Sequence, residues 1–245
     1  MLLRKLLWMT SIAVIALSIW FVGCSDNSFI SSTSSISENA PATVYVQMEQ
    51  GWRINYATVE PSTEYFSIEV TDPVSINGNP GFTIRHVNNT TNELWYTYMY
   101  SDGNAIFESS STNQRGDKIL ESPFVIGHSW NRIEDNGSSG TNDPNIYGDN
   151  DGGNPPDGYG YFNKTLPGSE YTIMTIAGKE TVKTLDGKSH GNCLKVERQT
   201  GENSYSYFWY AAGIGLVKYE NISGSLSSDN NRVLSIITDY QKVEY

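Results

Sequence analysis

The feature that most limits the fold of this 245-residue chain is an alternation of residue type at every second position. Val44, Val46 and Met48 begin the pattern, and residues 93–100 repeat it most clearly. A period of two is typical of β-strands, because successive side chains of a strand point to opposite faces. No window shows a sustained period of 3.6, so few helices are expected. The chain is therefore predicted to be all-β.

Further runs rich in β-branched and aromatic residues are bounded by Asn, Asp, Gly and Pro, which is the signature of strands and turns. They cover residues 65–71, 82–87, 93–100, 105–109, 123–133, 171–184, 192–198, 204–210, 216–221 and 233–243. Sequential strands with short connections are usually neighbours. We expect one curved, mostly antiparallel meander sheet of about ten strands, as a half-barrel or open barrel. A β-sandwich is the alternative.

The N-terminus has the parts of an export signal. Arg4-Lys5 precedes a largely apolar, uncharged run, residues 6–22. The end of this run and the next two residues read Phe21-Val22-Gly23-Cys24. These four residues resemble the lipobox of bacterial lipoproteins, with Phe21 in place of the usual leucine. The resemblance implies removal of residues 1–23 and attachment of acyl chains such as palmitate to Cys24, which would anchor the protein in a membrane. An uncleaved membrane helix is the alternative.

Composition divides the remaining chain into a tether and a domain. Residues 24–43 are rich in Ser and poor in large apolar residues, so they are expected to form a flexible tether. Residues 44–245 are expected to form a single β-domain. The protein would then be lipid-anchored in the cell envelope. In a Gram-negative cell this means the outer membrane or periplasm, and in a Gram-positive cell the outer face of the cell membrane. The pattern does not indicate an oligomeric state.

Charge and cysteine content exclude some functions. The chain has 16 Lys and Arg against 27 Asp and Glu, a net charge of −11, and no basic block. Such a protein is a poor match for nucleic acid, which is not expected as a partner. If Cys24 carries lipid, Cys193 is the one thiol left, so no internal disulfide is expected.

The least regular stretch, residues 134–160, is dense in Asn, Asp, Gly and Pro. Calcium prefers six to eight hard oxygen ligands on a flexible backbone, and Asp149, Asp151 and Asn154 could supply some of them. The match to a calcium loop is incomplete, because Tyr147 stands where the first ligand should be. A solvated insertion between strands is the alternative, and no cofactor is required.

Two tyrosine-rich strands are candidates for ligand contact. In residues 93–100, the side chains of Tyr96, Tyr98 and Tyr100 should share one face, and in residues 204–210 those of Tyr205, Tyr207 and Trp209 should do so. Such rows can stack on sugar rings. Cross-strand packing with wet hydroxyl groups is the alternative.

The C-terminal third resembles a known group. Gly191-Asn192-Cys193-Leu194-Lys195-Val196 and the phrase from Tyr207 to Glu220, YFWYAAGIGLVKYE, resemble strands of uncharacterised bacterial lipoproteins of the DUF3108-like kind, as does Pro123–Trp130. The resemblance covers about half of the domain. It implies an architecture related to the half-barrels of lipoprotein carriers, whose concave face holds acyl chains.

Catalytic patterns are not evident. The sequence has no Gly-x-Ser-x-Gly, no His-Glu-x-x-His and no Cys-x-x-Cys. His86, His128 and His190 are expected to be hydrogen-bonded surface residues, and Cys193 a small buried hydrophobe. We therefore expect no enzyme and no catalytic residues, but an envelope protein that binds a lipid or other hydrophobic ligand or serves in envelope assembly. A surface carbohydrate-binding or adhesion module, with or without calcium, is the alternative.

Overall fold

The computed structural model describes residues 36–60, 63–132, 173–201, 204–222 and 232–244, which all belong to one compact unit, Ile36–Tyr245. Its elements are a 3-10 helix η1 (Ala42–Val44) and strands β1 (Trp52–Glu60), β2 (Glu64–Ile76), β3 (Asn79–Asn88), β4 (Glu93–Ser101), β5 (Ala105–Ser109), β6 (Asp117–Glu121), β7 (Ser129–Asn131), β8 (Ile173–Lys183), β9 (Ser189–Gly201), β10 (Ser204–Ala211), β11 (Gly215–Ile222) and β12 (Arg232–Lys242).

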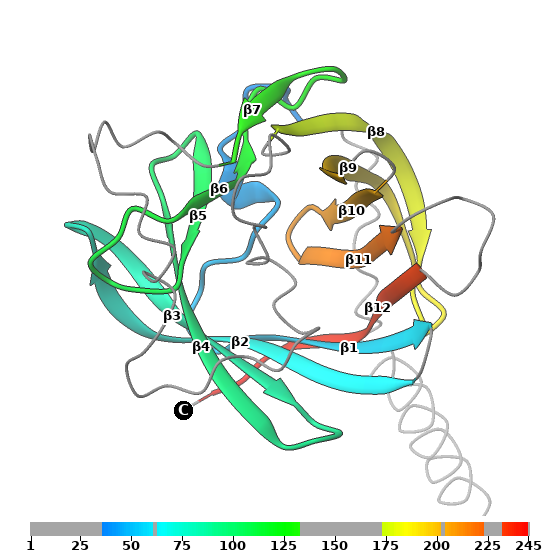
Figure 1. The fold of residues 1–245 in the computed structure, drawn as a ribbon, viewed down its shortest axis with the longest axis horizontal. Coiled ribbons are helices and arrows are strands. Elements are labelled where there is room, and N and C mark those ends of the chain that lie inside the picture. Colours follow the sequence, from blue (N-terminus) through cyan, green and yellow to red (C-terminus); the bar gives the residue numbers. More distant parts are fainter. Residues whose placement is uncertain (1–35, 61–62, 133–172, 202–203, 223–231, 245) are drawn as a thin grey trace, which may run out of the picture. The chain divides into compact units, whose positions relative to one another are not determined.

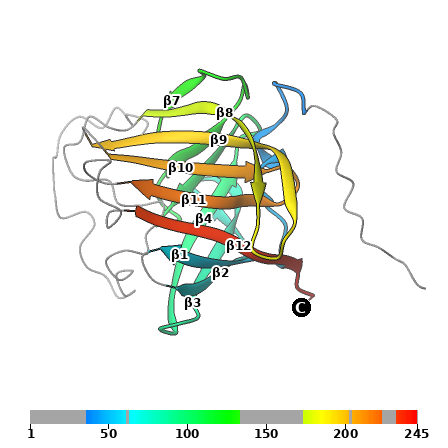
Figure 2. The ribbon, with the colours of Figure 1, turned by 90° about the vertical axis from the view of Figure 1, so that its right-hand side faces the viewer.

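The 12 strands form one antiparallel sheet in the order β6-β5-β4-β3-β2-β1-β12-β11-β10-β9-β8-β7. Every pair is consecutive in sequence except β1 with β12, which joins the two halves of the chain. The sheet curves into a nearly closed barrel (Figure 1). From the side, β8 to β12 lie next to one another and continue into β1 and β2 (Figure 2). The predicted all-β meander is thus confirmed.

The two edge strands, β6 and β7, follow each other in the chain and approach each other in space. The amide of Lys118 in β6 donates to the carbonyl of Arg132, just after β7, at 2.7 Å. The indole N–H of Trp130 donates to the carbonyl of Lys118 at 3.2 Å, and Arg132 pairs with Asp117 at 2.8 Å. These bonds satisfy part of the edge that an open sheet would leave unpaired.

Residues 36–51, which we call the N-terminal cap, pack on one end of the barrel. Ala42 donates to the carbonyl of Gly103 at 3.1 Å, and the carbonyl of Val44 accepts from Gly213 at 2.8 Å. Ala42 and Tyr45 are fully buried, and the Tyr45 ring meets Phe124 edge-on at 4.8 Å. The cap therefore joins the β4–β5 and β10–β11 turns. Its first residues, 36–43, belong to the stretch that composition assigns to the tether.

Two local predictions were wrong, and two strands were missed. Residues 44–49 alternate like a strand, but Ala42–Val44 forms η1 and the next residues form turns, because the cap packs across the barrel end instead of pairing with a strand. Of the predicted strand 123–133, the described residues 123–132 contain only the short strand β7. The sequence analysis also missed β1, although Trp52, Ile54 and Tyr56 alternate with Arg53 and Asn55, and it missed β6, which is short and does not alternate.

Candidate functional site

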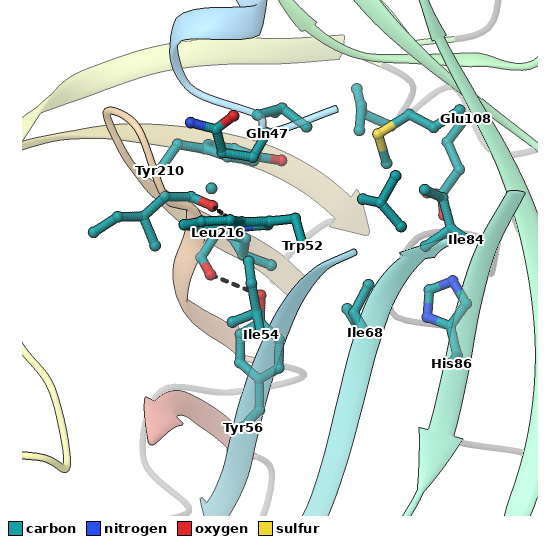
Figure 3. Close-up of a pocket in the computed structure, with 16 residues that line it drawn as sticks. Gln47, Trp52, Ile54, Tyr56, Ile68, Ile84, His86, Glu108, Tyr210 and Leu216 are labelled. Carbon is teal, nitrogen blue, oxygen red and sulfur yellow. Dashed lines mark hydrogen bonds between the residues drawn. The ribbon is translucent and has the colours of Figure 1, made fainter. Parts of the chain in front are cut away.

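The candidate site is a cavity of about 60 Å³ beneath the N-terminal cap. Val46 and Gln47 of the cap line it on one side. Inward side chains of β1–β6 and β10, Ile214 of the β10–β11 turn and the first residues of β11 line the rest (Figure 3). Besides Val46 and Ile119, the apolar, non-aromatic lining side chains are Ile54, Ile68, Val70, Ile84, Met99, Ile214 and Leu216. A cavity that binds benzene measures about 150 Å³, so this one has room for only a few carbon atoms.

Two hydrogen bonds fix the wall formed by β1 and the β10–β11 turn. The indole N–H of Trp52 donates to the carbonyl of Ile214 at 2.9 Å, and the hydroxyl of Tyr56 donates to the carbonyl of Leu216 at 2.7 Å. Both bonds are drawn in Figure 3. Because each ring has its polar atom satisfied by backbone, its apolar part is left to face the cavity. Trp52 and Gln47 are only half-buried, so this side of the cavity lies nearest to solvent.

The opposite wall carries a buried polar chain across β3, β4 and β5. The Thr97 hydroxyl donates to Glu108 Oε1 at 2.8 Å and lies 2.9 Å from His86 Nε2. A hydroxyl has one hydrogen, so His86 Nε2 must carry the proton that it donates to Thr97. Burial lowers the pKa of His86 to about 3, which keeps the ring neutral. Burial also raises the pKa of Glu108 to about 7, against the opposing effects of Thr97 and Arg132.

Some polar atoms in this region have no hydrogen-bond partner in the described part of the chain. They are Glu108 Oε2, the Tyr210 hydroxyl and Nε of Arg198. The three residues are 1%, 2% and 7% exposed, respectively. An unsatisfied buried polar group costs about 1–3 kcal/mol, so a cluster of them needs an explanation.

Electrostatics link the three residues. The Tyr210 hydroxyl interacts with Glu108, Arg132 and Arg198, and burial is the main reason that its pKa is raised. Burial lowers the pKa of Arg198 to about 10, with Arg132 as a second cause, so the guanidinium stays charged at neutral pH. Tyr210 and Glu108 both line the cavity, whereas Arg198 lies beyond it on the same face of the sheet as Phe208.

The predicted site residues fall in different places. Cys24, Asp149, Asp151 and Asn154 lie outside the described residues, so the lipid and calcium predictions stay predictions. Within the described ranges, no three His, Cys, Asp or Glu side chains are grouped to hold a metal. The described part of the chain also forms no helix of the length and apolar character needed to cross a membrane.

The histidines and Cys193 do not form a common site. His86 stacks on Trp95, His128 on Trp130, and His190 meets Tyr240. The prediction of a surface position was wrong for His86, which is 5% exposed because its side chain faces the barrel interior. Cys193 is fully buried as expected, and burial raises its pKa to about 11.

The aromatic rows have the predicted faces but are only partly available to a ligand. Along β10, Tyr205, Tyr207 and Trp209 form a ladder with ring centroids 6.3 and 6.0 Å apart. Trp209 is buried, with Lys218 at 4.0 Å and Lys195 at 5.1 Å over its ring. In β4, Tyr96 is exposed, whereas Tyr100 is buried and stacks on Phe107.

The sequence analysis missed Glu108, Arg198 and Tyr210. Glu108 lies in the fully buried strand AIFES, and Arg198 lies at an inward position of β9. A charged residue at an inward position of an alternating strand is the signal that could have singled them out. Their convergence could not be predicted, because Arg198 and Tyr210 lie in the other half of the chain from Glu108.

The comparisons with known proteins establish no family. No family model matches the chain, and no curated protein matches it. An exported protein with a YmcC-like fold from Bacteroides fragilis is 16% identical, with a TM-score of 0.40, over 79% of this chain and 97% of that one. A lipoprotein from Parabacteroides distasonis is 10% identical, with a TM-score of 0.39, over 79% of this chain and 96% of that one. Similarity at this level carries no argument about function, and the resemblance to the DUF3108-like group stays a prediction.

Proposed function

We propose that this protein is an exported, lipid-anchored binding protein of the cell envelope, without enzymatic activity, that holds a small hydrophobic ligand in the cavity beneath the N-terminal cap. The observation that carries the proposal is the cavity itself. Its wall is mostly aliphatic and aromatic, and its polar members are few, as in small-molecule sites. The export signal and lipobox of the sequence support a location at a membrane surface.

The size of the cavity limits the ligand. At about 60 Å³ it is well below the roughly 300–1,000 Å³ of drug-sized pockets. A whole acyl chain does not fit beside the cap, so the buried part of the ligand should be a short aliphatic group. Each buried methylene contributes about 0.8 kcal/mol, so a short chain supports weak to moderate affinity.

Calorimetric titration with 1-hexanol tests the proposal on residues 25–245, the chain left after the export signal and Cys24. The wild-type chain should bind 1-hexanol. Ile68→Trp replaces an aliphatic side chain with a bulky indole that fills the cavity, so this variant should bind 1-hexanol at least tenfold more weakly. Val87→Trp is the matched control, because Val87 lies on the other face of the sheet, next to His86 in β3. Absence of binding, or equal binding by the Ile68 variant in a folded state, would contradict the proposal.

A further inference from the structure

The interior of the barrel contains a buried cation, Arg198, that forms no ion pair among the described residues. The carboxylate of Asp117 acts on it electrostatically but is already paired with Arg132. Arg198 is 7% exposed, and no carboxylate of the described chain lies within 4.0 Å of its guanidinium. Its described contacts are a long hydrogen bond of 3.4 Å from Nη2 to the Ser206 hydroxyl and the face of Phe208 at 5.7 Å. Burying a charge is costly unless a counter-charge compensates it.

Three other arginines of the described chain are paired with carboxylates. Arg132, also buried, pairs with Asp117 at 2.8 Å. Arg53 and Arg85 both pair with one oxygen of Glu69, at 2.7 and 2.6 Å. Arg198 therefore differs from them in forming no ion pair of its own within the described residues, although it is nearly as buried as Arg132.

Two further groups in the same region could donate hydrogen bonds to an anion. The Tyr210 hydroxyl has no hydrogen-bond partner in the described chain and interacts electrostatically with Arg198. Glu108 Oε2 has none there either, and Glu108 in its protonated form is a hydrogen-bond donor. Figure 3 shows Tyr210 and Glu108 on opposite walls of the cavity. An anion between these walls would meet donors from β5 and β10, with the charge of Arg198 beyond Tyr210.

We propose that the ligand is an aliphatic monocarboxylate, of which a short part of the chain lies in the cavity and whose carboxylate is held by Tyr210 and the positive charge of Arg198. This inference rests on the proposed function and names its ligand class. Asp117 is shared between Arg132 and Arg198, and the raised pKa of Glu108 favours its neutral form at pH 6, so one ligand carboxylate would balance the one positive charge that remains. A dianionic phosphate monoester would leave surplus negative charge beside Glu108, so it should bind less well.

The test compares two probes of equal chain length, hexanoate and 1-hexanol, by calorimetry on residues 25–245 at pH 6. The wild-type chain should prefer hexanoate at least tenfold, which corresponds to about 1.4 kcal/mol. Arg198→Met should abolish this preference while 1-hexanol still binds. Tyr210→Phe, which removes one oxygen atom, should reduce the preference at least threefold.

Two control variants remove the same chemical groups from the other face of the sheet. Arg53→Met removes a guanidinium that pairs with Glu69, and Tyr100→Phe removes a hydroxyl that donates to the Arg115 carbonyl. Both should keep the wild-type preference. If Arg198→Met does not fold, Tyr210→Phe decides the result by itself, because its change in volume is small.

The outcomes separate this inference from the proposed function. Equal affinity of the wild-type chain for hexanoate and 1-hexanol would overturn the monocarboxylate assignment and leave the hydrophobic site intact. So would a preference that survives in Tyr210→Phe and Arg198→Met alike. Tighter binding of hexyl phosphate than of hexanoate would assign the anion site to a phosphate ester instead. Failure of all probes to bind would overturn both proposals.

Discussion

Glu108 is the residue whose ionisation should matter most for folding. Its pKa is about 7 in the fold, because of burial, against an ordinary value of 4.5 for an exposed glutamate. Between these values the folded state binds more protons than the unfolded state, so stability falls as pH rises from about 4.5 to about 7. A difference of this size corresponds to roughly 3 kcal/mol. The carboxylate is thus a destabilising group that the fold retains.

Glu108→Gln isolates this effect. The amide keeps the shape and the bond from Thr97 but does not ionise, so the free energy of unfolding of the variant relative to wild type should increase by about 2–3 kcal/mol between pH 5 and pH 8. Urea denaturation at a series of pH values measures the difference. His86 does not confound it, because its contribution is common to both proteins. A difference that does not change with pH would show that Glu108 is not buried as described.

Cys193 should be unreactive in the folded protein. Its side chain is fully buried, its thiol donates to the carbonyl of His190 at 3.2 Å, and burial raises its pKa to about 11. Thiolate is the reactive form, so a disulfide reagent at pH 8 should modify the native chain at least a hundredfold more slowly than the urea-unfolded chain. Absorbance of the released thiolate measures both rates. Comparable rates would contradict the packing of β9.

At the scale of elements, the junction between the N-terminal cap and the sheet depends on Gly51. Gly51 has φ +86°, its amide donates to the carbonyl of Val70, and its carbonyl accepts from the amide of Val243. A Cβ atom there would lie 2.2 Å from the Val243 carbonyl oxygen, which belongs to backbone and cannot yield easily. The position therefore requires glycine for two reasons, the positive φ and the close approach.

Gly51→Ala should reduce the free energy of unfolding by about 3 kcal/mol or more. Gly103→Ala is the matched control, because Gly103 has φ +98° but open space around the added Cβ. It should cost only the backbone strain, about 1–2 kcal/mol. Thermal and urea denaturation of both variants measure the two costs. Equal losses would show that the contact with Val243 does not limit residue 51.

At the scale of the molecule, the question is whether the barrel closes between β6 and β7. In solution, the amide of Lys118 should exchange with deuterium slowly, because it donates to the carbonyl of Arg132 across the closure. The amides of β1 and β12 should be among the slowest, since each strand has neighbours on both sides. Exchange of Lys118 as fast as that of an exposed turn amide would indicate an open edge.

The sequence by itself determined much of the local structure, though not all of it. Residues 93–100 and 204–210 alternate so strictly that their strands and faces could be predicted, because side-chain direction in a strand follows directly from position. The Asn, Asp, Gly and Pro residues between the runs predicted turns, and Gly187, between β8 and β9, has a positive φ. Together these signals favoured a meander of adjacent strands.

Only the tertiary structure decided how the ends of the meander meet and which polar groups share its interior. The pairing of β1 with β12 joins residues such as Trp52 and Lys242, and nothing in either strand specifies the other. Closure brings Glu108, Tyr210 and Arg198 to one interior, although their strands are distant in sequence. Local patterns record which face a side chain occupies. Register and curvature, which depend on the packing of the whole sheet, determine what that side chain faces.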